Sequence, residues 1–213
     1  MVPVTGQQST MPSPCLQPVT LTGRFVRLEP LGRAHAAGLL AAADPETFRY
    51  MHTVPRTWDV AGFEGYIDTL LASTAMNCFA VCRNDTSGGA TPVGVTAYLD
   101  IRPEHRGVEI GMTWYSPSVR GTAINPETKR LLLAHAFETD LYPAGPAIRV
   151  MLKTDERNAR SRAAILKLGA TFEGILRNHV VMPDGFLRQT AVYGVIDAEW
   201  PGVRARLDAR LSG

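Results

Sequence analysis

The segment spanning residues 108–133 most constrains how this chain folds, because a strand pattern there passes into a helix pattern through a short loop. Asn125 can cap free backbone N–H groups at the helix start, and Pro126 suits the first helical position. Glu127 favours the positive end of the helix dipole. An anion at this loop would meet several N–H donors, so the segment predicts a phosphate site.

The loop before this helix has the composition of a diphosphate site. Arg120 offers a guanidinium, and Gly121 lets the backbone come close to a ligand. The loop is not a Walker loop, which needs a glycine-rich stretch ending in Lys-Ser or Lys-Thr, and it is not a GxGxxG turn. ATP and NAD are therefore disfavoured as ligands.

Length and charge bound the class of protein. A chain of 213 residues is ordinarily one domain and is long enough for a substantial core. The net charge of +2, with both signs mixed along the chain, gives no basic stripe, so we expect no direct contact with nucleic acid. No run approaches the roughly 20 apolar residues of a membrane span, and no membrane association is expected.

The cysteines and histidines do not form a metal-binding pattern. Cys15, Cys78 and Cys82 fit neither a zinc knuckle nor a CxxC motif, and the five histidines are scattered. We therefore expect no metal and a cytoplasmic location.

Strand-like and helix-like segments alternate along most of the chain. Residues 1–20 are rich in Pro, Ser, Thr and Gln and are predicted to form a disordered tail, followed by a single domain over residues 21–213. Met11 is an alternative start. Strands are expected over residues 25–28, 78–83, 92–101, 108–115 and 147–154, with a final hairpin over residues 172–196. Helices are expected over residues 33–43, 60–74, 126–141, 159–167 and 199–211, with Gly169 as a left-handed cap.

The order of these elements, the Arg120 loop and the Asn158-Ala159-Arg160-Ser161 segment resemble the GNAT superfamily of acyl-CoA-dependent N-acyltransferases, in particular its RimJ/RimL-like branch. The similarity covers residues 21–211, including the opening GRFVRLEPL and the closing LGATFEG. It implies an α/β fold of the α+β type, with a mixed, mostly antiparallel twisted sheet of about seven strands flanked by helices. It also implies acetyl-CoA-dependent acetyl transfer by direct attack of a primary amine in a ternary complex.

The resemblance assigns coenzyme contacts to the end of one strand and to the loop after it. The family's phosphate loop usually reads Gln/Arg-x-x-Gly-x-Gly/Ala; Arg120 fits its first position, whereas Ala123 and Asn125 depart from it. A positive φ at Ala123 would argue against acyl-CoA binding. The predicted contacts are Thr113, Trp114, Tyr115, Arg120, Gly121, Thr122, Ala123, Asn125, Asn158 and Ser161, with an oxyanion N–H donor near Thr113 or Trp114.

The resemblance also suggests which residue protonates the leaving thiolate. Many family members use a Tyr seven residues after the Asn of the Asn-x-x-Ser segment, and Ile165 occupies that position here. Ser161 is therefore the candidate proton donor, with Asn158 holding the pantetheine. Helix capping is the structural alternative for both residues.

Glu109 is the candidate base that deprotonates the acceptor. Regular strand alternation places its side chain on one face with Gly111 and Thr113, and Ile110 and Met112 on the other. A solvated or ion-paired glutamate is the structural alternative.

The acceptor is predicted to be a protein N-terminal α-amine, because its pKa of about 7.7–8.0 requires only modest help from a base. His52 and Arg56 are the candidate substrate-binding residues, since this region borders the acceptor cleft in the RimL-like branch. A small-molecule amine acceptor and a non-catalytic acyl-CoA-binding protein remain the alternatives. The long hairpin and the resemblance also point to a homodimer.

Overall fold

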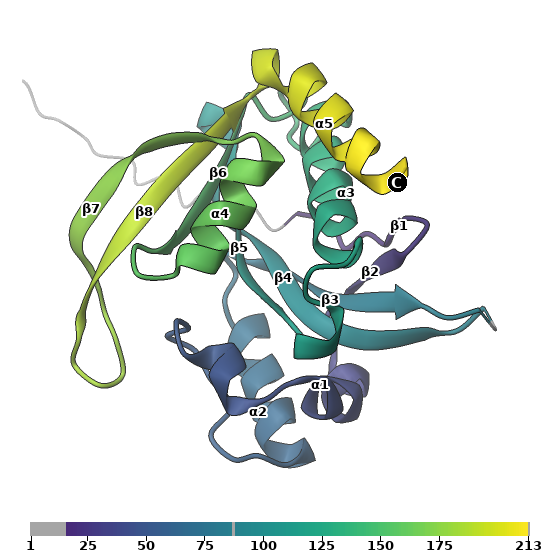
Figure 1. Ribbon diagram of the computed structural model, residues 1–213, viewed down its shortest axis with the longest axis vertical. Coiled ribbons are helices and arrows are strands. Elements are labelled where there is room, and N and C mark those ends of the chain that lie inside the picture. Colours follow the sequence, from purple (N-terminus) through teal and green to yellow (C-terminus); the bar gives the residue numbers. More distant parts are fainter. Residues whose placement is uncertain (1–15, 87, 213) are drawn as a thin grey trace, which may run out of the picture.

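The computed structural model describes residues 16–86 and 88–212, whose eight strands form one sheet in the order β1-β2-β3-β4-β5-β6-β8-β7 (Figure 1). Neighbouring strands are antiparallel except β5 and β6, which are parallel. The predicted fold class is confirmed, and the short β1 is the strand that the sequence analysis missed. The strands are β1 (Leu21–Thr22), β2 (Val26–Pro30), β3 (Asn77–Asn84), β4 (Ala90–Arg102), β5 (Gly107–Tyr115), β6 (Arg149–Asp155), β7 (Thr171–Val181) and β8 (Leu187–Ile196).

Helices cover both faces of the sheet. Figure 1 shows α1 and α2 on one side of it and α3 and α5 on the other. Each side has its own apolar cluster, with Phe63 and Val95 in the first and Tyr98 and Leu132 in the second. The α-helices are α1 (Ala36–Ala42), α2 (Val60–Leu71), α3 (Ile124–Glu138), α4 (Ala159–Leu168) and α5 (Trp200–Ser212). None of these described helices has the length and apolar character needed to span a membrane.

Short-range hydrogen bonds fix where two of the helices begin and end. Asp59 Oδ1 accepts a hydrogen bond from the Gly62 N–H at 2.7 Å and starts α2. Asn158 Oδ1 accepts one from the Ser161 N–H at 3.0 Å and starts α4. Gly169 has φ +110° and ends α4, which confirms the predicted left-handed cap.

The start of α3 differs from the prediction. The helix begins at Ile124, and Ala123 is its N-cap residue, so the predictions of Asn125 as the cap and Pro126 as the first helical position are wrong. Thr122 Oγ1 accepts a hydrogen bond from the Ile124 N–H at 3.3 Å. Because this hydroxyl satisfies a free donor, the helix can begin earlier, and Pro126 lies in the first turn, where its missing N–H costs nothing.

The packed part of the chain also begins earlier than the predicted boundary at Leu21. Leu16 is buried in the cluster beneath α3, and its carbonyl oxygen accepts a hydrogen bond from Asn77 Nδ2 at 3.1 Å. Residues 1–15 of the predicted tail, which include Met11 and Cys15, lie outside the described residues.

Glu127 ties the first turn of α3 to the edge of the sheet. Its carboxylate accepts hydrogen bonds from the N–H groups of Arg24, Phe25 and Val26 at 2.9, 2.6 and 2.8 Å. Gly23 makes this approach possible, because a Cβ atom there would lie 2.5 Å from Glu127 Cδ. The carboxylate therefore positions α3, and with it the loop before the helix, against β2.

We expect Glu127→Ala to lower the free energy of unfolding by about 2–4 kcal/mol, because three backbone donors lose a charged acceptor. Urea unfolding followed by circular dichroism would measure this change. Glu46→Ala is the matched control, since Glu46 is exposed and has only a 3.7 Å ion pair with Arg49. A loss for Glu127→Ala as small as that of the control would contradict the anchoring role.

Candidate active site

The sheet splits between β5 and β6. The two strands pair at only three positions, and the last pair is Glu109 with Met151. Beyond it, residues 110–115 of β5 and 152–155 of β6 have no pairing with each other. These diverging segments line a cavity of about 400 Å³, which the loop before α3 and the start of α4 also line.

A β-bulge in β5 changes which face its side chains occupy. Gly111 pairs with Ala97 and Trp114 pairs with Val95, so Met112 and Thr113 together oppose a single residue of β4. Met112 has φ +49°. The bulge inserts one residue into the alternation of side chains along β5, and the sequence pattern gives no sign of this insertion.

The predicted alternation is therefore wrong beyond Gly111. Met112 packs on the α1 and α2 side, whereas Ile110 lies in the cluster beneath α3. Thr113 turns toward α3, where its hydroxyl accepts a hydrogen bond from Lys129. Glu109 and Thr113 thus lie on opposite faces of β5.

The loop between β5 and α3 has the features that an anion site requires. Gly121 has φ +79°, and Ala123 has φ −67°, so the positive φ that would argue against acyl-CoA binding is absent at Ala123. Arg120, Gly121 and Asn125 line the cavity together with Arg160 of α4. Burial and the Arg160 charge lower the pKa of Arg120, and a bound anion would relieve this repulsion.

Thr122 and Ala123 are not among the residues that line the cavity. Thr122 donates a hydrogen bond to the Val119 carbonyl at 2.7 Å and accepts one from Ile124, so it closes the loop. These two residues shape the site and do not form its wall.

The α4 side of the cavity contains both residues of the predicted Asn-x-x-Ser segment. Asn158 caps the helix through Oδ1 and also lines the cavity. Ser161 is half-buried in the wall, and its hydroxyl forms no hydrogen bond within the described parts of the chain. Ile165 is buried against the core and offers no proton.

Trp114 and Tyr115 line the cavity, and their rings also belong to the two cores. Trp114 Nε1 donates a hydrogen bond to the Tyr66 hydroxyl at 3.1 Å on the α2 side. Tyr115 packs on the opposite side. Their side chains are therefore mainly structural.

Glu109 lies where the split begins. It is 9% exposed, and its Oε2 forms an ion pair with Lys153 Nζ of β6 at 2.8 Å. Gly111 leaves room for the carboxylate, since a Cβ there would lie 3.0 Å from Glu109 Oε1. The ion-paired alternative for Glu109 is thus present, in a position that faces the cavity.

The same part of the cavity contains further basic residues. His52 lines it, as do His179 and Arg188 from the β7–β8 hairpin. Arg56 is exposed and is not among the lining residues. Arg188 carries no signal in the sequence, because a hairpin that folds back onto the cavity cannot be recognised from residue spacing.

Lys129 of α3 is a second cavity residue that the sequence analysis missed. It is 7% exposed, its Nζ donates a hydrogen bond to Thr113 Oγ1 at 2.8 Å, and it has no ion pair with any described residue. Burial lowers its pKa to about 7. A usable signal existed, since Lys129 precedes Leu132 and Leu133 by three and four residues on the apolar stripe of the helix.

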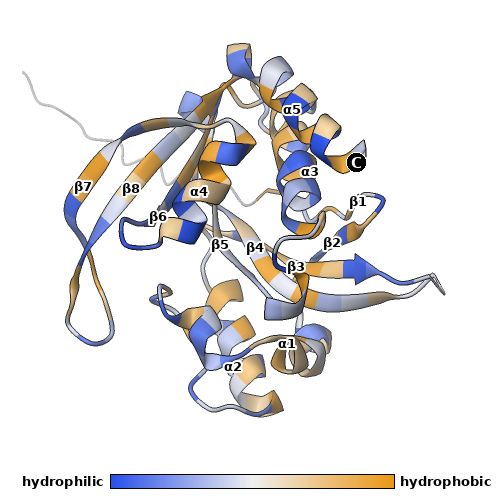
Figure 2. Ribbon diagram, viewed as in Figure 1, coloured by the Kyte–Doolittle hydropathy of each residue, from blue (hydrophilic) through white to orange (hydrophobic). Residues whose placement is uncertain are grey.

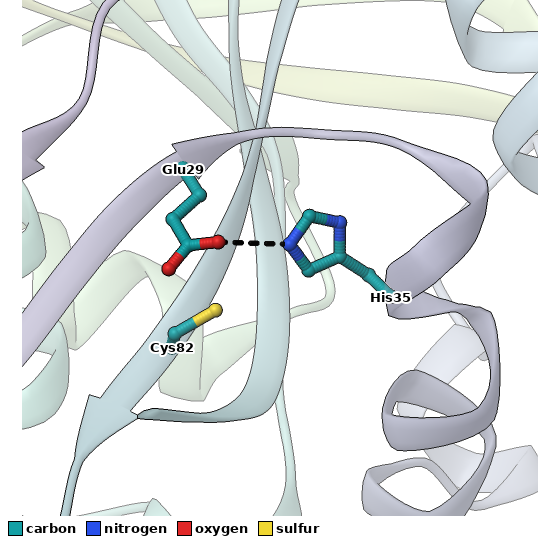
Figure 3. A group of neighbouring side chains, drawn as sticks. All are labelled: Glu29, His35 and Cys82. Carbon is teal, nitrogen blue, oxygen red and sulfur yellow. Dashed lines mark hydrogen bonds and ion pairs between the residues drawn. The ribbon is translucent and has the colours of Figure 1, made fainter. Parts of the chain in front are cut away.

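One group of potential metal ligands lies elsewhere among the described residues. Figure 3 shows Glu29 and His35 facing each other, with Cys82 beside them, and their ligand atoms lie within 4.8 Å of one another. Glu29 is already bound by Arg27 at 2.6 Å and by His35 at 3.2 Å. Burial raises the pKa of the Cys82 thiol to about 12. We interpret this group as an ion-pair network, and none of its members lines the cavity.

The split sheet, the anion-binding loop and the cavity between them define an acyltransferase. A family model described as an acetyltransferase (GNAT) domain matches residues 26–171, and the chain belongs to this family. No functionally curated protein matches the sequence.

Solved structures extend the family match over nearly the whole chain. A protein of T. thermophilus, provisionally assigned as an acetyltransferase, is 38% identical with a TM-score of 0.82, over 92% of this chain and 98% of its own. A GCN5-related N-acetyltransferase from Brucella melitensis is 30% identical with a TM-score of 0.81, over 92% and 86%. RimJ of Mycobacterium smegmatis, in complex with CoA-disulfide, shares the fold at 21% identity and a TM-score of 0.67, over 91% and 93%.

The buried Lys129 should make stability depend on pH. Its pKa is about 7 in the folded state, whereas an unfolded lysine titrates near about 10.4, so the unfolded state binds more protons between these values. The stability of the wild type should therefore rise from about pH 7 to about pH 10, by up to about 1.4 kcal/mol per pH unit from this group. Lys129→Met should remove that part of the rise.

Urea unfolding of both proteins at about pH 7, 8 and 9 would measure the difference. The advantage of Lys129→Met over the wild type should be largest at neutral pH and should shrink as the pH increases. Lys167→Met, at an exposed position of α4, is the control. Parallel pH profiles for the wild type and Lys129→Met would show that Lys129 is not buried with a lowered pKa.

Proposed function

We propose that this protein is an acetyl-CoA-dependent N-acetyltransferase of the RimJ/RimL-like type that transfers an acetyl group directly to a primary amine. The observation that carries the proposal is the split between β5 and β6, because one cavity joins the anion-binding loop to Glu109. A non-catalytic acyl-CoA-binding protein would need the loop but not a buried carboxylate beside it. We also propose a cytoplasmic location, which rests on the cysteine pattern of the sequence.

The coenzyme half of the cavity fits acetyl-CoA, which supplies the acetyl thioester. Arg120, Arg160 and the N-terminus of α3 would hold the phosphates. The edge of β5 beyond Glu109 has no strand partner, so its backbone groups are free for the pantetheine amides. Because Asn158 caps α4 through Oδ1, its amide nitrogen is left to donate a hydrogen bond to the pantetheine.

Backbone N–H groups of the bulge near Thr113 or Trp114 would donate to the carbonyl oxygen as its negative charge develops. Glu109 would accept the proton of the acceptor ammonium, either directly or through a water molecule. As the carbon–nitrogen bond forms and the carbon–sulfur bond breaks, the hydroxyl of Ser161 would give its proton to the departing sulfur. The serine would recover a proton, directly or through water, from the second N–H proton that the nitrogen loses as the amide forms. A protonated Lys129 is a second donor in the wall, and with a pKa of about 7 it is a stronger acid than a thiol of pKa about 8.5.

The acceptor predicted from the sequence, a protein N-terminal α-amine, rests on the resemblance of the sequence to the RimJ/RimL-like branch. His52 lies in the wall where such an acceptor would enter. Arg56 would contact only a larger acceptor that extends beyond the cavity. The alternative, a small-molecule amine, is supported by the charged side chains that line the cavity.

A homodimer through β7 also belongs to the proposal. β7 is an edge strand whose side chains are nearly all exposed, and Figure 2 shows apolar segments along it. Val181 is 68% exposed. We expect sedimentation equilibrium to give a dimer that Val181→Asp weakens, and a monomeric wild type at micromolar concentrations would contradict this.

Acetyl-CoA should stabilise the folded protein, by about 2.7 kcal/mol at a concentration of about 100 times Kd. Arg120→Ala should weaken binding about tenfold, which removes about 1.4 kcal/mol of this gain. Thermal unfolding with and without acetyl-CoA would measure both effects. Arg206→Ala, at an exposed position of α5, is the control. Equal stabilisation of the wild type and Arg120→Ala would exclude Arg120 from the coenzyme site.

Catalysis should depend on Glu109 and Ser161 while coenzyme binding does not. We expect Glu109→Gln and Ser161→Ala each to lower kcat by about 100-fold or more, because each removes a proton-transfer group. The thermal shift with acetyl-CoA should persist in both variants. Steady-state kinetics on an amine found by an acceptor screen would test this, and an unchanged kcat in either variant would exclude that residue as a proton carrier.

A further inference from the structure

Arg188 of β8 is a half-buried arginine in the cavity wall that lacks an anionic partner. Its Nε atom is buried and has no hydrogen-bond partner. Within residues 16–86 and 88–212, the side chain of Arg188 forms no hydrogen bond and no ion pair. A charged side chain whose Nε–H donor is buried without a partner is costly, so a conformation of this kind favours binding of an anion.

The carboxylates nearest to Arg188 already have other partners. Asp155 is buried and pairs with Arg157 at 2.7 Å, and Glu109 pairs with Lys153 at 2.8 Å. Burial lowers the pKa of Arg188, and Asp155 and Glu109 offset this only through longer-range attraction. Two ion pairs and one extra guanidinium leave a net positive charge in this half of the cavity.

The two histidines that face Arg188 do not change this balance at neutral pH. Burial and the Arg188 charge lower the pKa of His52. Burial, Lys153 and Arg188 lower the pKa of His179, against a smaller opposing effect of Glu109. Both imidazoles are therefore neutral at pH 7, and Arg188 is the source of the net charge.

We propose that the acceptor is a small primary amine that also carries a carboxylate, as an amino acid does, and that Arg188 binds this carboxylate while Glu109 faces the amine. This inference rests on the proposed N-acetyltransferase function and names its substrate class. A planar guanidinium binds a carboxylate through two parallel hydrogen bonds. A phosphate dianion would need more positive charge than a single free guanidinium supplies.

The limited volume of the cavity favours a small acceptor over a protein chain. The pantetheine arm and the acceptor must share about 400 Å³. A protein N-terminus presents a neutral amide next to its amine, so it would leave Arg188 without an anion. The carboxylate of an amino acid would pair with Arg188, which removes the cost of the unpaired charge, and would also fix the position of the amine.

The test compares acceptors that differ only in the carboxylate. Glycine, β-alanine and 4-aminobutyrate vary the distance between amine and carboxylate, and glycinamide and β-alaninamide lack the charge. A peptide with a free N-terminal alanine and 2-aminoethyl phosphate represent the two competing classes. With acetyl-CoA saturating, we expect kcat/KM for the best acid to exceed that of its amide by about 100-fold or more.

The variants separate a carboxylate contact from a structural effect. Arg188→Met should remove about 100-fold of kcat/KM for the acid and leave the amide within about threefold, and Arg188→Lys should restore part of the loss. Arg177→Met is the matched control, because Arg177 is an exposed arginine of the same hairpin that does not line the cavity. It should behave as the wild type.

Three outcomes would each overturn the carboxylate inference while leaving N-acetyl transfer intact. The first is equal kcat/KM values for acids and amides, and the second is a preference for the peptide or for 2-aminoethyl phosphate. The third is an equal loss of kcat/KM for acid and amide in Arg188→Met. If no amine is acetylated, titration calorimetry of glycine and glycinamide into the CoA-loaded protein would show whether the cavity binds a carboxylate. Binding of the acid alone, lost in Arg188→Met, would support the carboxylate site although the transfer proposal failed. If glycine and glycinamide bind equally well, or neither binds, the carboxylate site is overturned.

Discussion

The short parallel contact between β5 and β6 is the constraint on which the rest of the structure depends. Three residue pairs hold the strands together, and beyond them each strand has an edge with no partner on that side. Unpaired backbone groups inside a fold require a ligand or water. The chain that links the two strands contains α3, and the N-terminus of α3 and the loop before it line the cavity beside this gap. The gap and the anion site therefore arise from one topological feature.

The bulge in β5 and the carboxylate of Glu127 make that feature well defined. The bulge turns Thr113 toward α3 and leaves Glu109 on the α1 and α2 side, so the two faces of one strand serve different halves of the cavity. Glu127 binds three successive N–H groups at the start of β2 and fixes α3 against the sheet. A phosphate loop that precedes an anchored helix loses little entropy when a ligand binds.

Most of the fold could be predicted from the sequence, because strand and helix periods, caps and turns are local properties. Gly169 as a helix cap and the order of sheet and helix segments follow from such signals. The start of α3 could not be placed, since the choice between Asn125 and Thr122 depends on the turn before the helix. The face of Thr113 was also beyond reach, because a bulge leaves no mark in the alternation of residues.

The site was predictable where a motif repeats in a family and not where charges come from distant segments. Arg120, Asn158, Ser161 and Glu109, which the sequence analysis named as candidates, all line the cavity. Arg188 comes from the second arm of the hairpin and Lys129 from the buried face of α3, and neither belongs to a spaced motif. These two cations lie in the same cavity but differ in their surroundings: Lys129 donates to a hydroxyl and can lose its proton near pH 7, whereas Arg188 keeps its charge. Only Arg188 therefore demands an anion, and in our proposal the choice of acceptor depends on the hairpin and not on the coenzyme loop.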